Sequence, residues 1–384
     1  MTCDFVAVAW SLIPFAGRRL RQTEFDGHQL KHAQPCARCN GSVGMSQKPN
    51  RKSRGLHVVP SANKTTWGDW LRWNKRSLFV AGGAAVVGSV LLNRANARRA
   101  EAATPPAGKF IEVDGVRLHY VDRGEGAAVV LLHGNAVMLQ DFEISGVFPL
   151  AAEHHRVIAF DRPGFGYSDR PRATIWTPAT QAALIAKALK QIGVGPAVVV
   201  GHSWGTMVAL AMAMNHPEAV SGLVLVSGYY YGTVRPDVIP AAIPAVPVVG
   251  DLLAHTVAPL TGLVTGPLAV KASFAPAVVP AKFAEFPKAM ALRPSQLRAT
   301  AAEAALMVSS AVALSHRYGE LSVPVIIMAG AGDLIVHVDK HAGRLAGDIA
   351  GAELRVVPGQ GHMLHWGVPA EVVSAVNDVV ASAS

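Results

Sequence analysis

Residues 110–384 predict an α/β fold in which a mostly parallel sheet carries helices on both faces. Short apolar runs rich in β-branched residues alternate along this part of the chain with segments of helical period. The first two runs flank Asp114-Gly115, a strong signal for a β-hairpin. Later runs such as 128–132 are continuously apolar, which is typical of strands covered on both faces. We therefore expect the working residues at the carboxyl ends of parallel strands.

The expected elements follow one another in a regular order. Strands are expected where short apolar runs end in Gly, Asp, Asn or Pro: 110–113, 116–122, 128–132, 156–160, 197–200, 222–226, 325–329 and 353–357. Helices are expected where helix formers or a 3.6-residue apolar period separate these runs: 142–152, 177–192, 206–214, 338–345 and 369–381. Asn215-His216-Pro217 ends the third of these helices.

Charge is distributed unevenly along the 384 residues. The formal net charge is +9, but residues 1–109 hold 17 Lys and Arg against 5 Asp and Glu, whereas residues 110–384 hold 18 against 21. The globular part therefore offers no positive field for nucleic acid. It also lacks cysteine, since Cys3, Cys36 and Cys39 all precede it, and thiol chemistry is excluded there. With 51% hydrophobic residues, the chain has material for a large core.

The N-terminal stretch 1–77 is basic and is expected to be a poorly ordered extension. Its first 60 residues show no sustained period and many Arg, Lys, Gln, Asn, Gly and Pro. One group in it has metal-ligand spacing, H-x₃-H-x₃-C-x₂-C, formed by His28, His32, Cys36 and Cys39. No packed framework surrounds these residues in the sequence, so no metal site is predicted.

Residues 78–92 form an uncharged apolar stretch that is interpreted as a membrane anchor. As a helix it spans roughly 22 Å, which is short of a bilayer core of about 30 Å but sufficient with snorkelling flanks. The prediction is a single-pass, membrane-anchored protein. A signal-peptide segment, hence a secreted or periplasmic protein, and a soluble helix of a cytoplasmic protein remain alternatives. Residues 93–109 are read as a linker because Thr104-Pro105-Pro106 lies within them.

The motif Gly201-His202-Ser203-Trp204-Gly205 is the centre of the functional prediction. A short apolar strand precedes it and a helix-forming stretch follows it. Strand, G-x-S-x-G and helix are the context of a nucleophile elbow, in which the serine hydroxyl projects above the sheet from a strained turn. The two flanking glycines remove side chains that would collide where strand and helix cross. Ser203 is therefore the candidate nucleophile.

With these motifs in place, residues 110–384 resemble a serine hydrolase of the α/β-hydrolase superfamily, of the esterase and lipase kind with a helical lid. The resemblance rests on five stretches in family order: HGN at 133–135, DRPGFGYSDRP at 161–171, GHSWG at 201–205, an Asp at 333, and GQGHMLH at 359–365. It implies that 110–228 and 321–384 form the α/β-hydrolase core and that 229–320 is the lid. The apolar, proline-rich composition of this insert favours a substrate with an apolar part.

The same order assigns the catalytic roles. Ser203 attacks, His362 is its base, and Asp333 orients the imidazole. His365 is the competing base and Asp339 the competing acid. Asp333 has a second interpretation as a turn residue that caps the next helix.

Further site residues are assigned by the resemblance. The backbone amides of Asn135 and Trp204 are expected to form the oxyanion hole. Tyr229 and Tyr230 are predicted substrate contacts, with ordinary hinge packing as the alternative. The presence of Asn135 and Trp204 at these positions also resembles the pattern of haloalkane dehalogenases. Those enzymes carry an aspartate nucleophile, and a serine would leave an ether that the His–Asp pair cannot hydrolyse.

The sequence thus predicts a serine hydrolase that cleaves carboxylic esters with apolar groups, without metal or organic cofactor. The predicted partners are a small apolar ester and, through the N-terminal segment, a membrane. One alternative is a C–C bond hydrolase of ring-cleavage products that uses the same three residues on a ketone. The other is a binding protein that kept the fold and lost turnover.

Overall fold

The computed structural model describes residues 67–233 and 241–383. Contacts divide the described residues into a unit that ends at Gly82 and a larger unit that begins at Gly83. Helix α2 (Trp67–Ala103) belongs to both units. The histidines and cysteines with metal-ligand spacing, at residues 28–39, lie outside the described residues.

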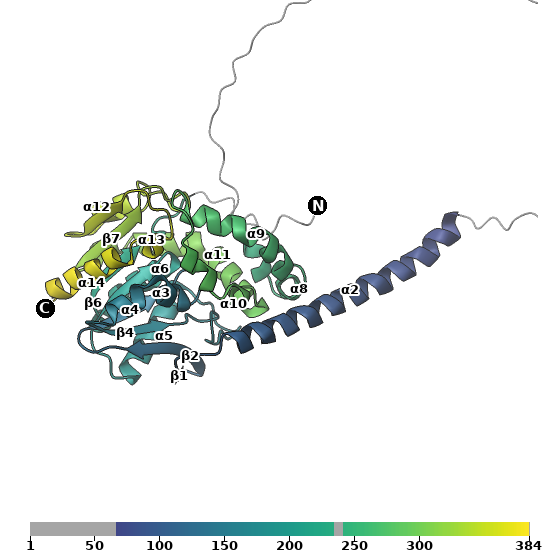
Figure 1. The fold of residues 1–384 in the computed structure, drawn as a ribbon, viewed down its shortest axis with the longest axis horizontal. Helices are drawn as coiled ribbons and strands as arrows, with labels where there is room; N and C mark the ends of the chain where they lie inside the picture. Colours follow the sequence, from purple (N-terminus) through teal and green to yellow (C-terminus); the bar gives the residue numbers. More distant parts are fainter. Residues whose placement is uncertain (1–66, 234–240, 384) are drawn as a thin grey trace, which may run out of the picture. The chain divides into compact units, whose positions relative to one another are not determined.

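The larger unit is built on one eight-stranded sheet (Figure 1). Its strands are β1 (Lys109–Val113), β2 (Val116–Arg123), β3 (Ala128–Leu132), β4 (Arg156–Phe160), β5 (Ala197–His202), β6 (Val220–Val226), β7 (Val325–Gly330) and β8 (Glu353–Val357). They lie in the order β1-β2-β4-β3-β5-β6-β7-β8. The first two pairings, β1 with β2 and β2 with β4, are antiparallel and the rest are parallel. This sheet confirms the predicted fold class.

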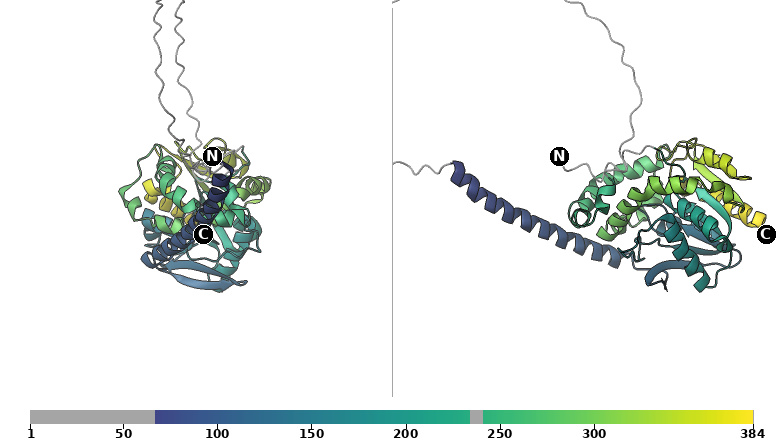
Figure 2. Two further views of the ribbon diagram at one scale, coloured as in Figure 1. Left: turned by 90° about the vertical axis from the view of Figure 1, so that its right-hand side faces the viewer. Right: turned by 180° about the vertical axis from the view of Figure 1, so that it is seen from behind.

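Helices cover both faces of the sheet, as Figure 2 shows from two further directions. In β3, Val130 and Leu132 pack into one core while Val129 and Leu131 pack into the other, because successive side chains alternate across a strand. One face carries α5 (Pro178–Gln191), α6 (Trp204–Asn215) and α12 (Ala342–Asp348). The other carries α3 (Gln140–Ser145), α4 (Val147–Ala151), α13 (Leu364–Gly367) and α14 (Pro369–Ala383).

Two predicted helices have different bounds in the structure. The single helix expected at 142–152 is two helices, α3 and α4, because Gly146 between them adopts φ 100°. That left-handed conformation ends a helix and is one that glycine adopts without strain. The helix expected at 338–345 begins only at Ala342. Residue 339, expected inside it, therefore lies in the preceding turn.

The insert between β6 and β7 is helical, and its helices group together at one side of the sheet (Figure 1). It contains η2 (Ile243–Ala245), α8 (Val249–His255), α9 (Ala258–Phe274), η3 (Ala281–Glu285), α10 (Lys288–Ala291), α11 (Pro294–Ser315) and η4 (Tyr318–Glu320). The long helix α11 begins at Pro294, a residue that is favoured in the first turn of a helix. Arg293 precedes it without a side-chain cap.

Helix α2 extends beyond the apolar stretch 78–92 into the residues predicted to be a linker. Ala100 is buried, and the Thr104 amide donates to its carbonyl at 3.0 Å. The linker prediction is therefore wrong for residues 93–103. By length and hydropathy, α2 from Ser77 to Ala103 could cross a bilayer, and so could α11. Helix α11, however, packs against α6 and carries the fully buried Glu303.

Candidate active site

Ser203 lies on a sharp turn between β5 and α6. The strand ends at His202 and the helix begins at Trp204, so a single residue makes the turn. Ser203 has φ 52° and ψ −116°, a conformation that L-residues rarely adopt. Its amide donates to the Val226 carbonyl of β6 at 2.9 Å, and its own carbonyl accepts from Thr206 at 3.1 Å. These bonds hold a strained residue in place, as a nucleophile elbow requires.

The glycines two residues before and after Ser203 are required by close approaches of the backbone. A Cβ at Gly201 would lie 2.6 Å from the Thr206 backbone, and one at Gly205 would lie 2.1 Å from the Leu132 carbonyl oxygen. Helix α6 therefore crosses both β3 and β5 at a distance that no other residue type permits. The spacing of the motif follows from this packing.

The structure brings together the three residues predicted to form the triad. His362 Nε2 lies 3.0 Å from Ser203 Oγ, and His362 Nδ1 lies 2.8 Å from Asp333 Oδ2. The imidazole and the carboxylate are 2% and 5% exposed, so both are shielded from water. Asp333 follows β7 and His362 follows β8, and each loop leaves the carboxyl end of its strand. Base and acid therefore meet the serine at one edge of the sheet.

The two oxygens of Asp333 have different partners, and neither caps α12, which begins only at Ala342. Oδ2 faces His362, whereas Oδ1 accepts the amides of Ile335 and Val336 at 2.8 and 2.9 Å. The turn fixes the carboxylate that orients the imidazole. The competing acid, Asp339, is exposed, and the competing base, His365, pairs with Asp141 at 2.9 Å.

The loop after β3 lies against the elbow. A Cβ at Gly134 would be 3.2 Å from Ser203 Cβ, so glycine permits this approach. Within the described residues, neither the Asn135 amide nor the Trp204 amide donates a hydrogen bond to another group. The Asn135 side chain is used structurally, since Nδ2 donates to the Thr300 carbonyl of α11 at 3.1 Å.

A buried ion pair holds this loop from behind. The Arg162 guanidinium donates to the carbonyls of His133 and Gly134 at 2.7 and 2.9 Å. It also forms a bidentate pair with Glu303 of α11, and both side chains are fully buried. Burial, with the Arg162 charge beside it, holds the pKa of His133 well below its usual value, so this ring is neutral. The sequence did not predict Glu303 as a residue near the site. The only feature of the sequence that could have indicated Glu303 is that it is a single acidic residue within an alanine-rich helix.

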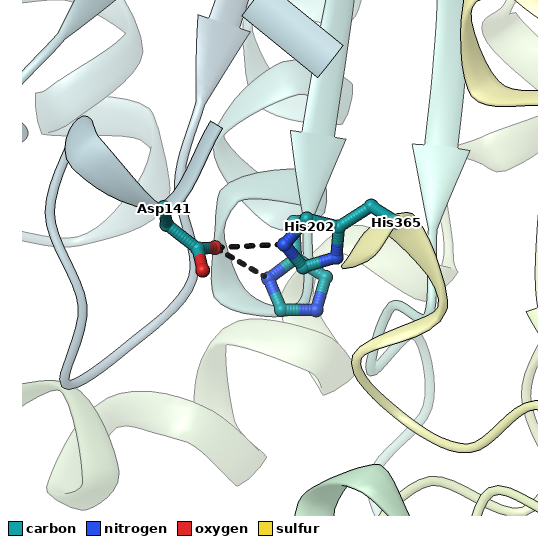
Figure 3. Close-up of side chains that lie close together, drawn as sticks. All are labelled: Asp141, His202 and His365. Atoms are coloured by element: carbon teal, nitrogen blue, oxygen red, sulfur yellow. Dashed lines mark hydrogen bonds and ion pairs between the residues drawn. The ribbon is translucent and has the colours of Figure 1, made fainter. Parts of the chain in front are cut away.

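A second buried polar group lies beneath the elbow (Figure 3). Asp141 faces the rings of His202 and His365, and one ligand atom from each of the three lies within 4.8 Å of the others. The carboxylate accepts from His365 Nε2 at 2.9 Å and from Trp366 Nε1 at 2.8 Å. These donors engage both of its oxygens, so hydrogen bonding accounts for the carboxylate without an ion. His202 in turn contacts the His362 carbonyl at 3.2 Å, which links the group to the candidate base.

Tyr229 and Tyr230 are in the core. They are 2% and 0% exposed, and the Tyr229 hydroxyl contacts Thr233 Oγ1 at 3.0 Å. The Tyr230 amide donates to His341 Nδ1 at 3.1 Å. This packing corresponds to the hinge alternative, and substrate contact by these residues stays a prediction.

With this geometry described, the comparison with known proteins identifies the family. The model of the α/β hydrolase fold family matches residues 127–369, which is more than half of the chain. The chain belongs to the α/β hydrolase fold family.

Two curated relatives are similar to this chain over about a third of its length. One is the dihydrolipoyllysine-residue acetyltransferase component of the acetoin cleaving system of Cupriavidus necator, 38% identical over 32% of this chain and 33% of its own. Another is the 2-hydroxymuconate semialdehyde hydrolase of Pseudomonas putida, 34% identical over 32% of this chain and 43% of its own. The chain thus matches less than half the length of these two relatives.

Solved structures share the fold over most of the chain. An esterase from Exiguobacterium antarcticum has a TM-score of 0.56 at 24% identity and covers 72% of this chain and 100% of its own. A membrane phospholipase A has a TM-score of 0.57 at 19% identity and covers 82% and 99%. These structures show that the fold of this chain is shared with known enzymes.

Proposed function

We propose that this protein is a membrane-tethered serine hydrolase that cleaves carboxylic esters with apolar groups. The observation that carries the proposal is the continuous hydrogen-bonded chain from Ser203 through His362 to Asp333, which begins at a strained elbow. A serine hydroxyl is a weak nucleophile until a base lies within hydrogen-bond reach, and here that base is itself oriented by a carboxylate.

The reaction runs in two steps. Ser203 Oγ attacks the acyl carbon while His362 Nε2 takes its proton, and the imidazolium then protonates the departing alcohol. Water, deprotonated by the same imidazole, attacks the acyl-enzyme and releases the acid. Asp333 keeps Nδ1 protonated and stabilises the imidazolium without taking the proton itself. The route requires no metal or organic cofactor.

The amides of Asn135 and Trp204 stabilise the oxyanion in this proposal. Trp204 is the first residue of α6, so its N–H has no partner within the helix and the helix dipole adds to its field. The approach of Gly134 to Ser203 supports the presence of the Asn135 amide on the same side. Each such donor is typically worth about 3–4 kcal/mol in the transition state.

The nucleophile and the insert support an apolar ester. An acyl group on Ser203 is an ester that the His–Asp pair can hydrolyse, whereas an alkyl group would remain as an ether. The insert, α8 to α11, is the lid in this proposal, and its apolar composition favours an apolar acyl or alcohol part. The long apolar run of α2 supports tethering to a membrane.

A C–C bond hydrolase is the second candidate, because a relative is named 2-hydroxymuconate semialdehyde hydrolase. The same three residues would act on a ketone. Turnover of a ring-cleavage dienoate, compared with that of p-nitrophenyl esters, separates the two candidates.

The proposal is tested by labelling with a fluorophosphonate probe and by assay of an ester chain-length series. We expect one labelled site, lost in Ser203→Ala, and turnover that increases with acyl chain length before it levels off. His365→Gln is the matched control for His362→Gln, because both histidines are buried but only His362 contacts Ser203. Probe labelling that persists in Ser203→Ala, or folded wild type that neither labels nor cleaves any ester, would overturn the proposal.

A further inference from the structure

The insert exposes a set of large apolar side chains on α8, α9 and the residues beside them. We call this set the α8–α9 face. Its members are Val246, Val248, Val249, Leu252, Val257, Leu260, Leu263, Val264 and Leu268. Val248 and Val264 are 79% and 77% exposed. Nine exposed apolar side chains on two successive helices differ from the singly scattered apolar residues of ordinary soluble surfaces, and groups of this kind mark interaction sites.

Helix α9 is apolar on its opposite side as well. Ala258, Pro259, Gly262 and Phe274 are buried against the rest of the protein. Leu292 packs so closely on Gly262 that a Cβ there would lie 2.5 Å from its side chain. A helix with apolar residues on all sides is usually buried on all sides. In this structure, the described residues cover only one side of α9.

The threonine hydroxyls on and beside this face are satisfied within their own helices. No charged residue occurs in α9 before Lys271. The hydroxyls of Thr261 and Thr265 donate to the carbonyls of Ala258 and Thr261 at 3.0 and 2.9 Å. Thr256 does the same toward Leu252 at 2.6 Å. Internal satisfaction of this kind is what contact with hydrocarbon requires, because lipid tails offer no hydrogen-bond partner.

The α8–α9 face is joined to α2 at the end of the apolar stretch of that helix. Asn93 Nδ2 donates to the carbonyls of His255 and Thr256, both at 2.9 Å, and Ser89 Oγ donates to Thr256 at 3.1 Å. Those carbonyls lie at the 67° bend between α8 and α9. A groove of about 310 Å³ also runs between α2 and the insert, lined by Ala97 and Ala100 on one side and Leu263 on the other.

We propose that the α8–α9 face lies in the surface layer of the same lipid bilayer that holds α2. The proposal rests on the membrane tethering proposed above. The bilayer is favoured over a second copy or another protein because the face adjoins the apolar stretch of the anchor. Exposed Arg94, Arg98 and Arg99 follow that stretch within about two turns, where anionic headgroups would meet them. Helix α9 has 17 residues, about 25 Å, and its bend and its packing on the insert favour lying at the interface over spanning.

The geometry has a consequence for the substrate. The same insert carries α11, whose Thr300 carbonyl accepts from Asn135 and whose Glu303 pairs with Arg162 beside the elbow. A face in the bilayer would place the proposed lid at the lipid surface, so an ester could enter the site from the membrane. The substrate class is then an ester that partitions into lipid.

The test uses the full chain with a single environment-sensitive fluorophore (NBD) on a cysteine. Cys3, Cys36 and Cys39 are replaced by serine, and the label is placed at Val264→Cys or, as a matched control on an exposed strand position, at Val356→Cys. Each is mixed with vesicles of phosphatidylcholine and phosphatidylglycerol. We expect flotation with the vesicles for both. Only the label at 264 should shift to shorter wavelength and be quenched by a nitroxide lipid.

The possible results distinguish contact of the α8–α9 face with lipid from anchoring of the protein through α2. Flotation with an unshifted, unquenched label at 264 would overturn the α8–α9 contact and leave the anchor intact. Absence of flotation would overturn both. A shift at 264 that appears without vesicles and grows with protein concentration would assign the face to a second copy and overturn the lipid proposal.

A second experiment tests the α8–α9 face by measuring rates of ester hydrolysis. Val264→Asp with Leu268→Asp should reduce hydrolysis of an ester embedded in vesicles by at least about tenfold, because two charges would enter the apolar layer. Hydrolysis of a short water-soluble ester should be unchanged. Val278→Asp with Val356→Asp, exposed positions outside the face, should change neither rate. Equal loss on both esters would indicate misfolding or a site effect and would contradict the proposal.

Discussion

The core and the insert of this protein differ in how far their apolar side chains are buried. In the core, Val129 to Leu132 of β3 are fully buried, and the sheet is covered on both faces. In the insert, α8 and α9 bury one side and expose apolar residues on the other. Exposed apolar side chains are costly in water. The outer side of α8 and α9 is therefore suited to contact with another apolar phase rather than with water.

The two regions also differ in how they use polar groups. The core places buried polar groups around Ser203, where Arg162, Asp141 and Asp333 each hold a loop or ring by several hydrogen bonds. The outer helices of the insert satisfy their hydroxyls locally. Helix α11 connects the regions through the pair of Glu303 with Arg162. In the proposed function, the core carries the chemistry and the insert contacts the substrate.

The largest expected effect tests whether the chemistry belongs to the core alone. Asp333→Asn should lower kcat by roughly 10⁴-fold, because the imidazole loses the partner that selects its tautomer. Asp339→Asn is the control, since Asp339 is exposed in the neighbouring turn. Steady-state kinetics on a soluble ester measure both. Comparable losses in the two variants would contradict the assignment of the acid.

The connection between the regions is tested by Glu303→Gln. Removing one charge of a fully buried pair leaves Arg162 uncompensated and should reduce the free energy of unfolding by about 3–5 kcal/mol. Glu320→Gln breaks an exposed pair with Arg317 and should cost less than about 1 kcal/mol. Denaturant unfolding measures the difference. Equal stability of the two variants would show that the insert is not fastened to the core through Glu303.

A smaller effect concerns the buried polar group beneath the elbow. Burial opposes ionisation of Asp141, but His365, His202 and Trp366 outweigh it and hold the pKa of this carboxyl below its usual value. Its contribution is therefore present above the unfolded pKa of about 3.9 and is lost as pH falls through the lower folded pKa. Asp141→Asn should cost roughly 1–3 kcal/mol at neutral pH. Its deficit relative to wild type should shrink below about pH 4; a deficit independent of pH would contradict this ionisation.

The strands could be predicted from sequence closely because a strand covered on both faces is a short, continuously apolar run, and most of these runs are followed by turn residues. Gly201, Ser203 and Gly205 could be assigned to a tight elbow because only glycine permits the crossings observed there. Local reasoning failed where one residue decided the outcome. Gly146 splits a continuous helical pattern.

Contacts between segments that are distant in the sequence could not be predicted from local sequence patterns. Glu303 pairs with Arg162, which lies 141 residues away. The helical continuation of α2 through Ala103 depends on burial of Ala100 and on the bond of Asn93 to the insert. Neither interaction has a signal within its own segment, so a linker and an ordinary helix were the natural predictions.

Trapping the acyl-enzyme tests the central claim most directly. A p-nitrophenyl ester with a slowly hydrolysed acyl group is mixed with the protein, quenched in acid and digested for mass spectrometry. The account predicts a burst of nitrophenol and the acyl mass on the peptide that contains Ser203. Steady ester turnover with no acylated peptide, or an acyl group on another residue, would contradict it.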